Sequence, residues 1–144
     1  MTVNTGSAHY EGLGKDGKGH VSTGSGALDD QPYGFNTRFE NAPGTNPEEL
    51  VAAAHASCFT MATSFGLAKA GHEDGQLDTE CAVTLEKDGD GFTVTKSALT
   101  LRAQVPGISE ADFEKVAGDA KANCPMSKLL DCEITLDWEL NASG

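Results

Sequence analysis

The sequence predicts an α+β fold, taken as one domain over residues 1–144. Three observations lead to this class: a Gly-rich region precedes a long helical segment, a strand hairpin follows that segment, and a second helix precedes a closing strand. Strands and helices in this mixed order, without regular alternation, are typical of α+β proteins. The length suits a single domain that buries its core without metals or disulfides.

The first 45 residues are rich in Gly, Ser, Thr and Asn. They predict two short strands, near 8–12 and 21–23, on either side of a Gly-rich turn at 14–19. Segment 31–40 predicts an ordered turn followed by a short strand, and 41–45 predicts a loop.

The clearest element is a helix that begins after Asn46. Asn46 as the cap, Pro47 at the first helical position and Glu49 three residues after the cap form a capping-box pattern. The helix is expected to reach about Lys69, with Gly71 as its stop. Its middle is apolar or small on nearly every side, which predicts a central helix buried all round.

The second half predicts a hairpin, a helix and a final strand. Alternation over 77–85 predicts a half-buried strand, 88–91 a tight turn, and 92–105 the returning strand, whose phase shifts near 96–98 and indicates a bulge. Ser109 with Asp112 caps a helix that ends near 122–123. Cys124-Pro125 then opens a short helical turn, and alternation over 132–140 predicts the closing strand.

Charge and composition argue against several classes of partner. The chain has 10 Lys and Arg against 22 Asp and Glu, a formal net charge of -12. Such a surface repels nucleic acid and anionic lipid, so neither a nucleic-acid nor a membrane partner is expected. No apolar run approaches the length of a membrane span, and residues 1–10 show no secretory signal. We therefore expect a cytoplasmic protein, in which a disulfide is transient and catalytic.

The four cysteines divide by their surroundings. Cys81 and Cys132 are in phase with the apolar residues of two strands, which indicates structural cysteines. Cys124 precedes a helix-opening proline, where unpaired N–H groups favour a thiolate, although it could serve only as a cap. Cys58 lies among alanines in mid-helix, where burial alone would leave it inert. As a nucleophile Cys58 needs a cation, and Arg38 is the best candidate.

His55 raises two further possibilities, because it lies three residues before Cys58 and can share its face. A Cys–His nucleophile lacks a signalled orienting group and oxyanion hole. A zinc site lacks paired ligand spacing. A hydrogen-bonded core histidine is the favoured interpretation, and no metal or cofactor is expected.

At this point two motifs identify a family. GTNPEEL at 44–50 followed by AAHASCF at 53–59 closely resembles the first signature of the OsmC/Ohr family, and NCPMS at 123–127 resembles its second cysteine motif. Segment 31–40 resembles the OsmC branch, which carries its arginine there. The resemblance covers nearly the whole chain. It implies antiparallel sheets around a central helix and an intertwined homodimer with two active sites at the interface.

The resemblance also implies a thiol peroxidase that prefers organic hydroperoxides. Cys58 would be the peroxidatic cysteine, Cys124 the resolving cysteine, and Arg38 with Glu49 the activating pair, unless Glu49 serves only as a helix cap. The reductant would be a lipoylated protein or another dithiol. Glu49 and Cys58 would lie on opposite faces of a straight helix and ~13.5 Å apart along it, which favours a site shared by two chains. A redox sensor or ligand-binding module with the same cysteines is the alternative, and turnover with a dithiol separates the two.

Overall fold

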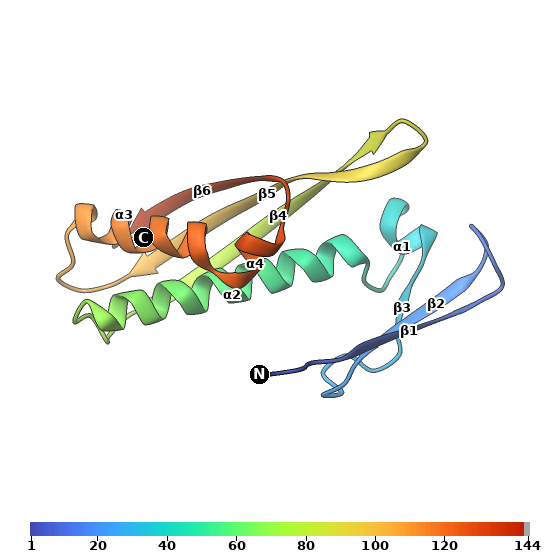
Figure 1. Ribbon diagram of the computed structural model, residues 1–144, viewed down its shortest axis with the longest axis horizontal. Helices are drawn as coiled ribbons and strands as arrows, with labels where there is room; N and C mark the ends of the chain where they lie inside the picture. The colour runs from blue at the N-terminus through green and yellow to red at the C-terminus, as the bar shows by residue number, and fades with distance from the viewer. Residues whose placement is uncertain (143–144) are drawn as a thin grey trace. The chain divides into compact units, whose positions relative to one another are not determined.

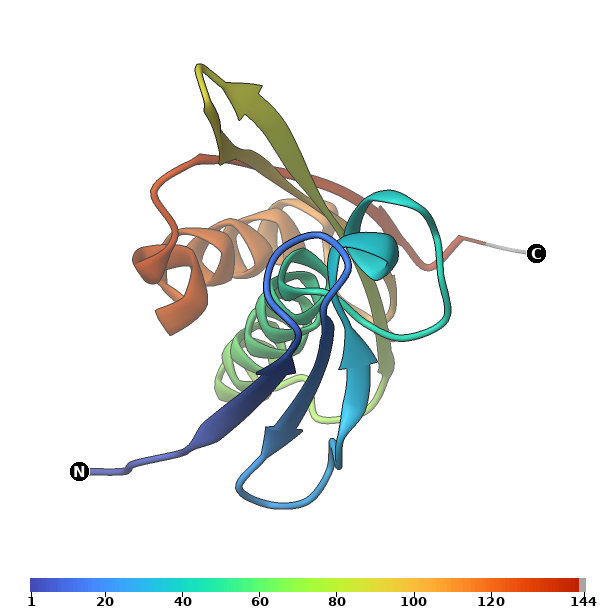
Figure 2. The same cartoon turned by 90° about the vertical axis from the view of Figure 1, so that its right-hand side faces the viewer.

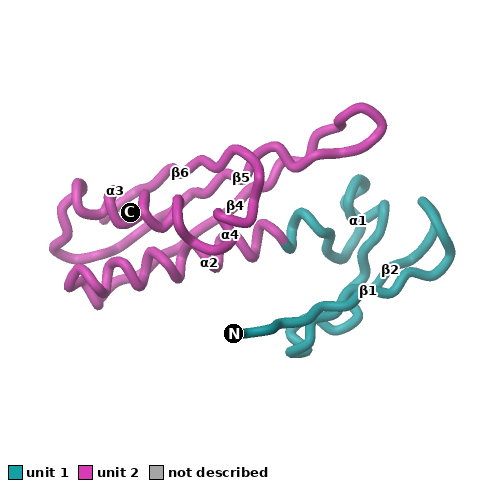
Figure 3. Tube along the Cα trace, in the orientation of Figure 1, with its two compact units in different colours: residues 1–50 teal, residues 51–144 magenta. Residues whose placement is uncertain are grey.

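The computed structural model describes residues 1–142 of the chain. The chain forms two compact units, residues 1–50 and residues 51–144 (Figure 3). Strands and helices are mixed in both units, and the described strands form two three-stranded sheets. The α+β class is therefore confirmed, and the single domain over residues 1–144 stays a prediction.

The first unit is built on an antiparallel sheet in the order β1 (Gly6–Glu11), β2 (Lys18–Thr23), β3 (Gln31–Tyr33) (Figure 2). The Tyr10 and Tyr33 rings meet edge to face across it, with centroids 6.1 Å apart. The Tyr10 hydroxyl donates to the Gly14 carbonyl at 2.8 Å and so closes the Gly-rich turn. Both predicted strands lie where the sequence placed them, with slightly different ends.

The segment at 31–40 differs from its prediction, because the strand comes first and a short helix follows. After β3, Gly34 caps helix α1 (Phe35–Phe39). The Thr37 hydroxyl accepts from the Gly34 N–H at 2.8 Å and donates to the Gly34 carbonyl at 3.0 Å. These two local hydrogen bonds close a helical turn, which overrides the strand preference of the aromatic residues.

Helix α2 (Pro47–Lys69) begins and ends as predicted. The Asn46 side-chain oxygen accepts from the Glu49 backbone N–H at 2.8 Å, which satisfies one of the unpaired donors of the first turn. The Asn46 amide also donates to the Thr37 carbonyl at 3.2 Å. This cap therefore ties the start of α2 to helix α1.

The second unit contains the sheet β4 (Gln76–Asp88), β5 (Gly91–Gln104), β6 (Glu133–Leu140). Strands β4 and β5 are antiparallel, whereas β6 runs parallel to β5, so this sheet is mixed and not wholly antiparallel as expected. Thr84 and Leu85 pair with Lys96 and Val94, which makes Thr95 the extra residue of a bulge. The bulge was predicted one residue further along.

Helices α2, α3 (Glu110–Asn123) and α4 (Pro125–Leu129) cover one face of this sheet (Figure 1). The Ser109 side chain caps α3 by accepting from the Asp112 N–H at 3.1 Å, as predicted. The Phe113 ring of α3 packs on Trp138 of β6, with centroids 5.1 Å apart. The buried core joins α2, β5 and α3, through Phe59, Leu67, Leu99, Leu101, Phe113 and Ala117.

The prediction that α2 is buried all round was wrong for the chain by itself. Its buried residues are His55, Phe59, Thr63 and Leu67, which are four apart and form one stripe. On the other side Met61 and Phe65 are 59% and 70% exposed. The chain itself therefore leaves much of these two side chains uncovered.

Helix α2 also corrects the expectation about membrane spans. By length and composition alone it could cross a membrane, and 22% of its most apolar 18-residue stretch is buried. Core helices of soluble proteins meet the same criteria, so one such helix is weak evidence for a span.

Truncation of Phe59 to alanine should lower the free energy of unfolding by about 3–5 kcal/mol, because it opens a cavity under a ring with no exposed surface. Urea unfolding measures the loss. Phe65→Ala is the matched control, since it removes the same ring from an exposed position of the same helix. At concentrations too low for association it should cost less than about 1 kcal/mol, and equal losses would contradict the burial pattern.

Candidate active site

The structure brings Cys58 and Cys124 together within the second unit. Cys58 lies on α2, and Cys124 lies at the junction that ends α3 and begins α4. The Cys58 sulfur interacts with the Cys124 side chain and with the Met126 backbone. Both cysteines predicted to form a reactive pair are therefore neighbours, although 66 residues separate them in sequence.

Cys124 is held by the first turn of α4. Its sulfur accepts from the Ser127 N–H at 3.4 Å and lies 3.1 Å from the Ser127 hydroxyl. Pro125 occupies the first helical position, as expected for a helix that starts at the cysteine. Cys124 is only 2% exposed, so its sulfur is reached mainly by protein atoms.

Burial raises the pKa of the Cys58 thiol above its ordinary value, a hydrogen bond from the Met126 backbone opposes this, and the Cys124 thiol adds to it. A thiol with a raised pKa is a poor nucleophile at neutral pH. Cys58 therefore needs a cation near its sulfur to react as a thiolate.

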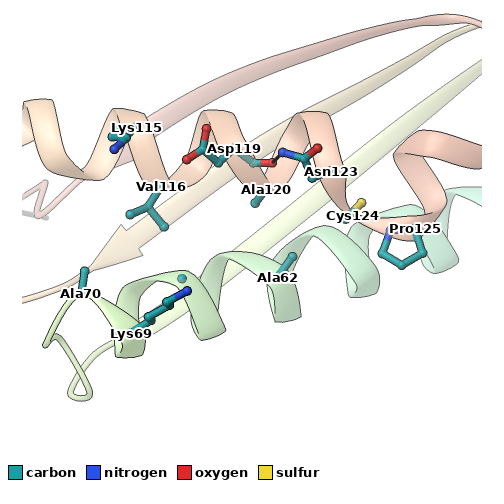
Figure 4. Close-up of a pocket in the computed structure, with 11 residues that line it drawn as sticks. Ala62, Lys69, Ala70, Lys115, Val116, Asp119, Ala120, Asn123, Cys124 and Pro125 are labelled. Atoms are coloured by element: carbon teal, nitrogen blue, oxygen red, sulfur yellow. Dashed lines mark hydrogen bonds between the residues drawn. The ribbon is translucent and has the colours of Figure 1, made fainter.

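A groove between α2 and α3 reaches Cys124 (Figure 4). Its volume is about 520 Å³, and Ala62, Val116 and Ala120 line its apolar part. Lys69, Lys115 and Asp119 also line it. Cys124 is one of the residues that line the groove, although its side chain is almost fully buried.

Arg38 lies in the first unit, where it forms a bidentate ion pair with Glu48. Its Nε donates to Glu48 Oε1 at 2.7 Å and its Nη2 donates to Glu48 Oε2 at 3.0 Å. The arginine and glutamate side chains are 34% and 15% exposed. Two parallel hydrogen bonds fix the plane of the guanidinium, as a positioning carboxylate would.

Glu49, the predicted partner of Arg38, accepts from the Thr45 hydroxyl at 2.9 Å. Neighbouring residues of a helix point about 100° apart, so Glu48 and Glu49 leave the helix in different directions. Within one chain the structure therefore shows Glu48 on the guanidinium, and the pairing of Arg38 with Glu49 stays a prediction. Sequence reasoning missed Glu48, which carries no signal to distinguish it from its neighbour.

An aromatic cavity of about 300 Å³ lies beside Arg38 in the first unit. Tyr10, Tyr33, Phe35 and Phe39 are among its walls. The guanidinium carbon lies 5.4 Å from the centre of the Phe39 ring, a cation–π contact. This arginine therefore combines a charge with an apolar surrounding.

His55 is the fully buried, hydrogen-bonded core histidine that the sequence favoured. Its Nδ1 lies 2.6 Å from the Ser97 hydroxyl and its Nε2 lies 2.8 Å from the Ser127 hydroxyl. Sequence reasoning did not single out either serine. The available signal was Ser97, a polar residue in phase with the buried Leu99 and Leu101 of the same strand.

Cys81 and Cys132 have the properties of structural cysteines. Burial raises the pKa of both thiols, and Asp131 and Glu133 raise that of Cys132 further. Cys81 lies on β4 and Cys132 just before β6, on opposite sides of β5. The Cys132 thiol also raises the pKa of Cys81, and both cysteines are free thiols in this structure.

Among residues 1–142, no group of three or more His, Cys, Asp or Glu side chains lies in a geometry that could hold a metal ion. Cys58 and Cys124 bring two sulfur atoms to the candidate site.

Comparison with known proteins gives a consistent result. A family model for OsmC-like proteins matches residues 39–139. The chain is 52% identical over 143 residues to peroxiredoxin OsmC of Escherichia coli K12, covering 99% of this chain and all of that protein. It is 33% identical over 125 residues to an organic hydroperoxide resistance protein-like protein of Staphylococcus aureus MSSA476, covering 86% and 87% of the two chains.

Solved structures share the fold. The organic hydroperoxide resistance protein OhrB of Bacillus subtilis is 28% identical, with a TM-score of 0.65 over 94% of this chain and 97% of that one. An OsmC-like protein of unknown function from Vibrio cholerae has a TM-score of 0.76 at 16% identity, over 96% of this chain and all of that one.

Proposed function

Because this chain belongs to the family of OsmC-like proteins, we propose that it is a thiol-dependent peroxidase that reduces organic hydroperoxides to alcohols. The observation that carries the proposal is the contact between Cys58 and Cys124, two thiols in different elements. The names of its relatives, a peroxiredoxin and organic hydroperoxide resistance proteins, support peroxide as the substrate.

The reaction proceeds in two chemical steps. The Cys58 thiolate attacks the outer oxygen of ROOH, the O–O bond breaks, and the alkoxide takes a proton to leave as ROH. Cys58 becomes a sulfenic acid. Cys124 then attacks that sulfur, the S–O bond breaks, and water leaves as the Cys58–Cys124 disulfide forms. A dithiol, such as a lipoylated protein, returns both cysteines to thiols, and no cofactor is needed.

Arg38 supplies the charge that Cys58 needs. A guanidinium beside the sulfur lowers the thiol pKa and hydrogen-bonds the departing oxygen. Glu48 holds the guanidinium in plane within one chain, and Glu49 stays a second candidate for this role. The aromatic cavity at Arg38 supports a substrate with an apolar group in preference to hydrogen peroxide.

The working unit in this proposal is a homodimer in the cytoplasm. Apolar side chains exposed along α2, with Met61 and Phe65 the largest, support a second copy of the chain as the surface that covers them. A reducing compartment keeps the dithiol available.

A steady-state assay with dihydrolipoamide tests the function directly. Cumene hydroperoxide and a fatty-acid hydroperoxide should support many turnovers, with kcat/KM well above that for hydrogen peroxide. A single oxidation without turnover would instead identify a redox sensor. Equal kcat/KM values for all three peroxides would overturn the preference for organic substrates.

Substitution of Cys124 by serine should separate the two steps. The variant should consume one equivalent of hydroperoxide at the wild-type rate, because Cys58 is intact, and then accumulate a sulfenic acid that dimedone traps. Excess peroxide should drive Cys58 to the sulfinic acid, since no second thiol resolves the intermediate. Mass spectrometry of peptides measures both products. Turnover at the wild-type rate, or a Cys81–Cys132 disulfide in oxidised wild type, would contradict the mechanism.

A further inference from the structure

A continuous row of hydrogen-bonding groups runs through the buried interior behind Cys124. The Cys124 sulfur lies 3.1 Å from the Ser127 hydroxyl, which lies 2.8 Å from Nε2 of His55. On the other side of the ring, Nδ1 lies 2.6 Å from the Ser97 hydroxyl, and that oxygen lies 3.1 Å from the Cys81 sulfur. The resolving cysteine is therefore connected to a buried imidazole through one hydroxyl.

Two arrangements of protons, which run in opposite directions along the row, satisfy every contact, and the proposal uses the one that makes Cys124 a donor. With the ring proton on Nδ1, His55 donates to Ser97, and the Ser97 hydroxyl donates to the Cys81 sulfur. Nε2 then accepts from the Ser127 hydroxyl, whose oxygen accepts from the Cys124 thiol. All the donors point the same way, from Cys124 toward Cys81. In this tautomer the imidazole has a lone pair ready to receive a proton from the Cys124 side.

We propose that Ser127 and His55 are positioning residues that take up the Cys124 thiol proton when Cys124 attacks oxidised Cys58. This inference rests on the proposed peroxidase function. The Cys124 proton passes to the Ser127 oxygen as the Ser127 proton passes to Nε2 of His55. The thiolate attacks the Cys58 sulfenic sulfur, the S–O bond breaks, and the leaving hydroxide is protonated to water. The imidazolium then gives up its proton, and the sum is two thiols and one peroxide oxygen converted to a disulfide and water.

Because Cys124 is buried, its thiol proton must leave through groups of the protein. The side chain is 2% exposed, so bulk water has little access to its proton, and a buried thiol is a poor attacking group. After the transfer, the Ser127 hydroxyl and backbone N–H both donate to the thiolate sulfur, which stabilises the negative charge.

The surroundings of His55 keep it neutral before the transfer. Burial lowers the pKa of the imidazole, and no charged neighbour contributes to that shift. The titratable groups that face it are thiols: Cys81 of β4, 3.9 Å from Nδ1, and Cys124 through Ser127. At neutral pH one ring nitrogen of His55 therefore carries no proton and can accept one. It stops being an acceptor only when acid protonates the ring.

The test follows the two oxidation steps separately in rapid mixing of reduced protein with one equivalent of cumene hydroperoxide. Peroxide loss reports sulfenic acid formation, and quenching with dimedone reports its conversion to disulfide. Ser127→Ala should leave the first step within about twofold and slow the second by about 100-fold, the range for loss of acid–base assistance. Ser127→Thr, which keeps the hydroxyl, should recover most of the second rate. His55→Gln should resemble Ser127→Ala.

Thr63→Val is the matched control, because it also removes a buried hydroxyl, in this case one that donates to the Phe59 carbonyl outside the row. It should leave both steps unchanged. The pH profile adds a readout that a purely structural role would not alter. The wild-type second step should be flat near neutral pH and fall at acidic pH as His55 is protonated, whereas in Ser127→Ala it should rise by about tenfold per pH unit.

Each outcome decides the proposal. If wild type consumes no hydroperoxide, the proposed function fails and the relay with it. If wild type forms the disulfide and Ser127→Ala does so equally fast with the same pH profile, the relay alone is wrong. If Ser127→Thr is as slow as Ser127→Ala, or Thr63→Val is equally slow, packing and not the hydroxyl sets the rate, and the relay is again wrong.

Discussion

Replacement of Cys58 by serine should abolish peroxide consumption, with residual activity below about one thousandth of wild type. A serine hydroxyl is a far weaker nucleophile than a thiolate at neutral pH. The effect should appear in the first turnover, before any reductant acts. Loss of cumene hydroperoxide in a stopped-flow instrument measures it without interference from later steps.

Cys132→Ser is the matched control for that variant. It also replaces a sulfur by an oxygen, at another half-buried cysteine. This variant should keep full activity, and its free energy of unfolding should fall by about 1–3 kcal/mol if the new hydroxyl lacks a hydrogen-bond partner. Substantial peroxide consumption by Cys58→Ser would mean that another thiol is the nucleophile. Cys124 would then be the first candidate, since it adjoins the groove between α2 and α3.

Removal of the Arg38 guanidinium should slow the first step by about 100- to 1,000-fold, comparable to the loss of one donor to a developing oxyanion. Burial raises the pKa of Cys58, so without a nearby cation less thiolate exists at neutral pH. The rate of Arg38→Ala should therefore climb with pH through the alkaline range, where wild type has already levelled. Arg38→Lys should recover little, because an ammonium cannot make two parallel hydrogen bonds to Glu48.

Three variants show whether the effect belongs to Arg38 in particular. Arg102→Ala removes an exposed arginine whose nearest carboxylate, Glu139, is 3.8 Å away, and it should leave the rate unchanged. Glu48→Gln should reproduce part of the Arg38→Ala loss if the ion pair positions the guanidinium, and Glu49→Gln should show whether the neighbouring carboxylate shares that role. Normal alkylation of Cys58 at neutral pH in Arg38→Ala would rule out activation by this arginine.

Local signals in the sequence predicted most of the elements. Three helices begin with a cap whose side chain accepts from the backbone N–H three residues later: Asn46, Ser109 and Cys124. Such a cap can be predicted from a few neighbouring residues. Short-range hydrogen bonds also explain why the prediction for segment 31–40 was wrong. The Thr37 hydroxyl closes a turn on Gly34, and two hydrogen bonds of this kind are invisible to an argument from apolar alternation.

Long-range contacts could not be read from spacing. Nothing near Cys58 indicates that Cys124 lies beside it, and that pairing was expected only from the family resemblance. The Ser127–His55–Ser97 row joins three elements far apart in the chain, so no local sequence pattern predicts these hydrogen bonds. The exposed side of α2 also escaped prediction, because an all-apolar helix does not reveal whether its own chain or another covers each face.

The parallel pairing of β5 and β6 has a consequence for folding kinetics. Parallel neighbours need a connection that returns along the sheet, and α3 and α4 supply it, with Cys124 between them. Contacts such as His55 with Ser127, 72 residues apart, close large loops and so form late. A refolding chain therefore carries Cys58 for a time without Cys124 beside it. During that interval an oxidant would drive Cys58 past the sulfenic acid, so chains that fold under peroxide stress should accumulate irreversibly oxidised, inactive molecules.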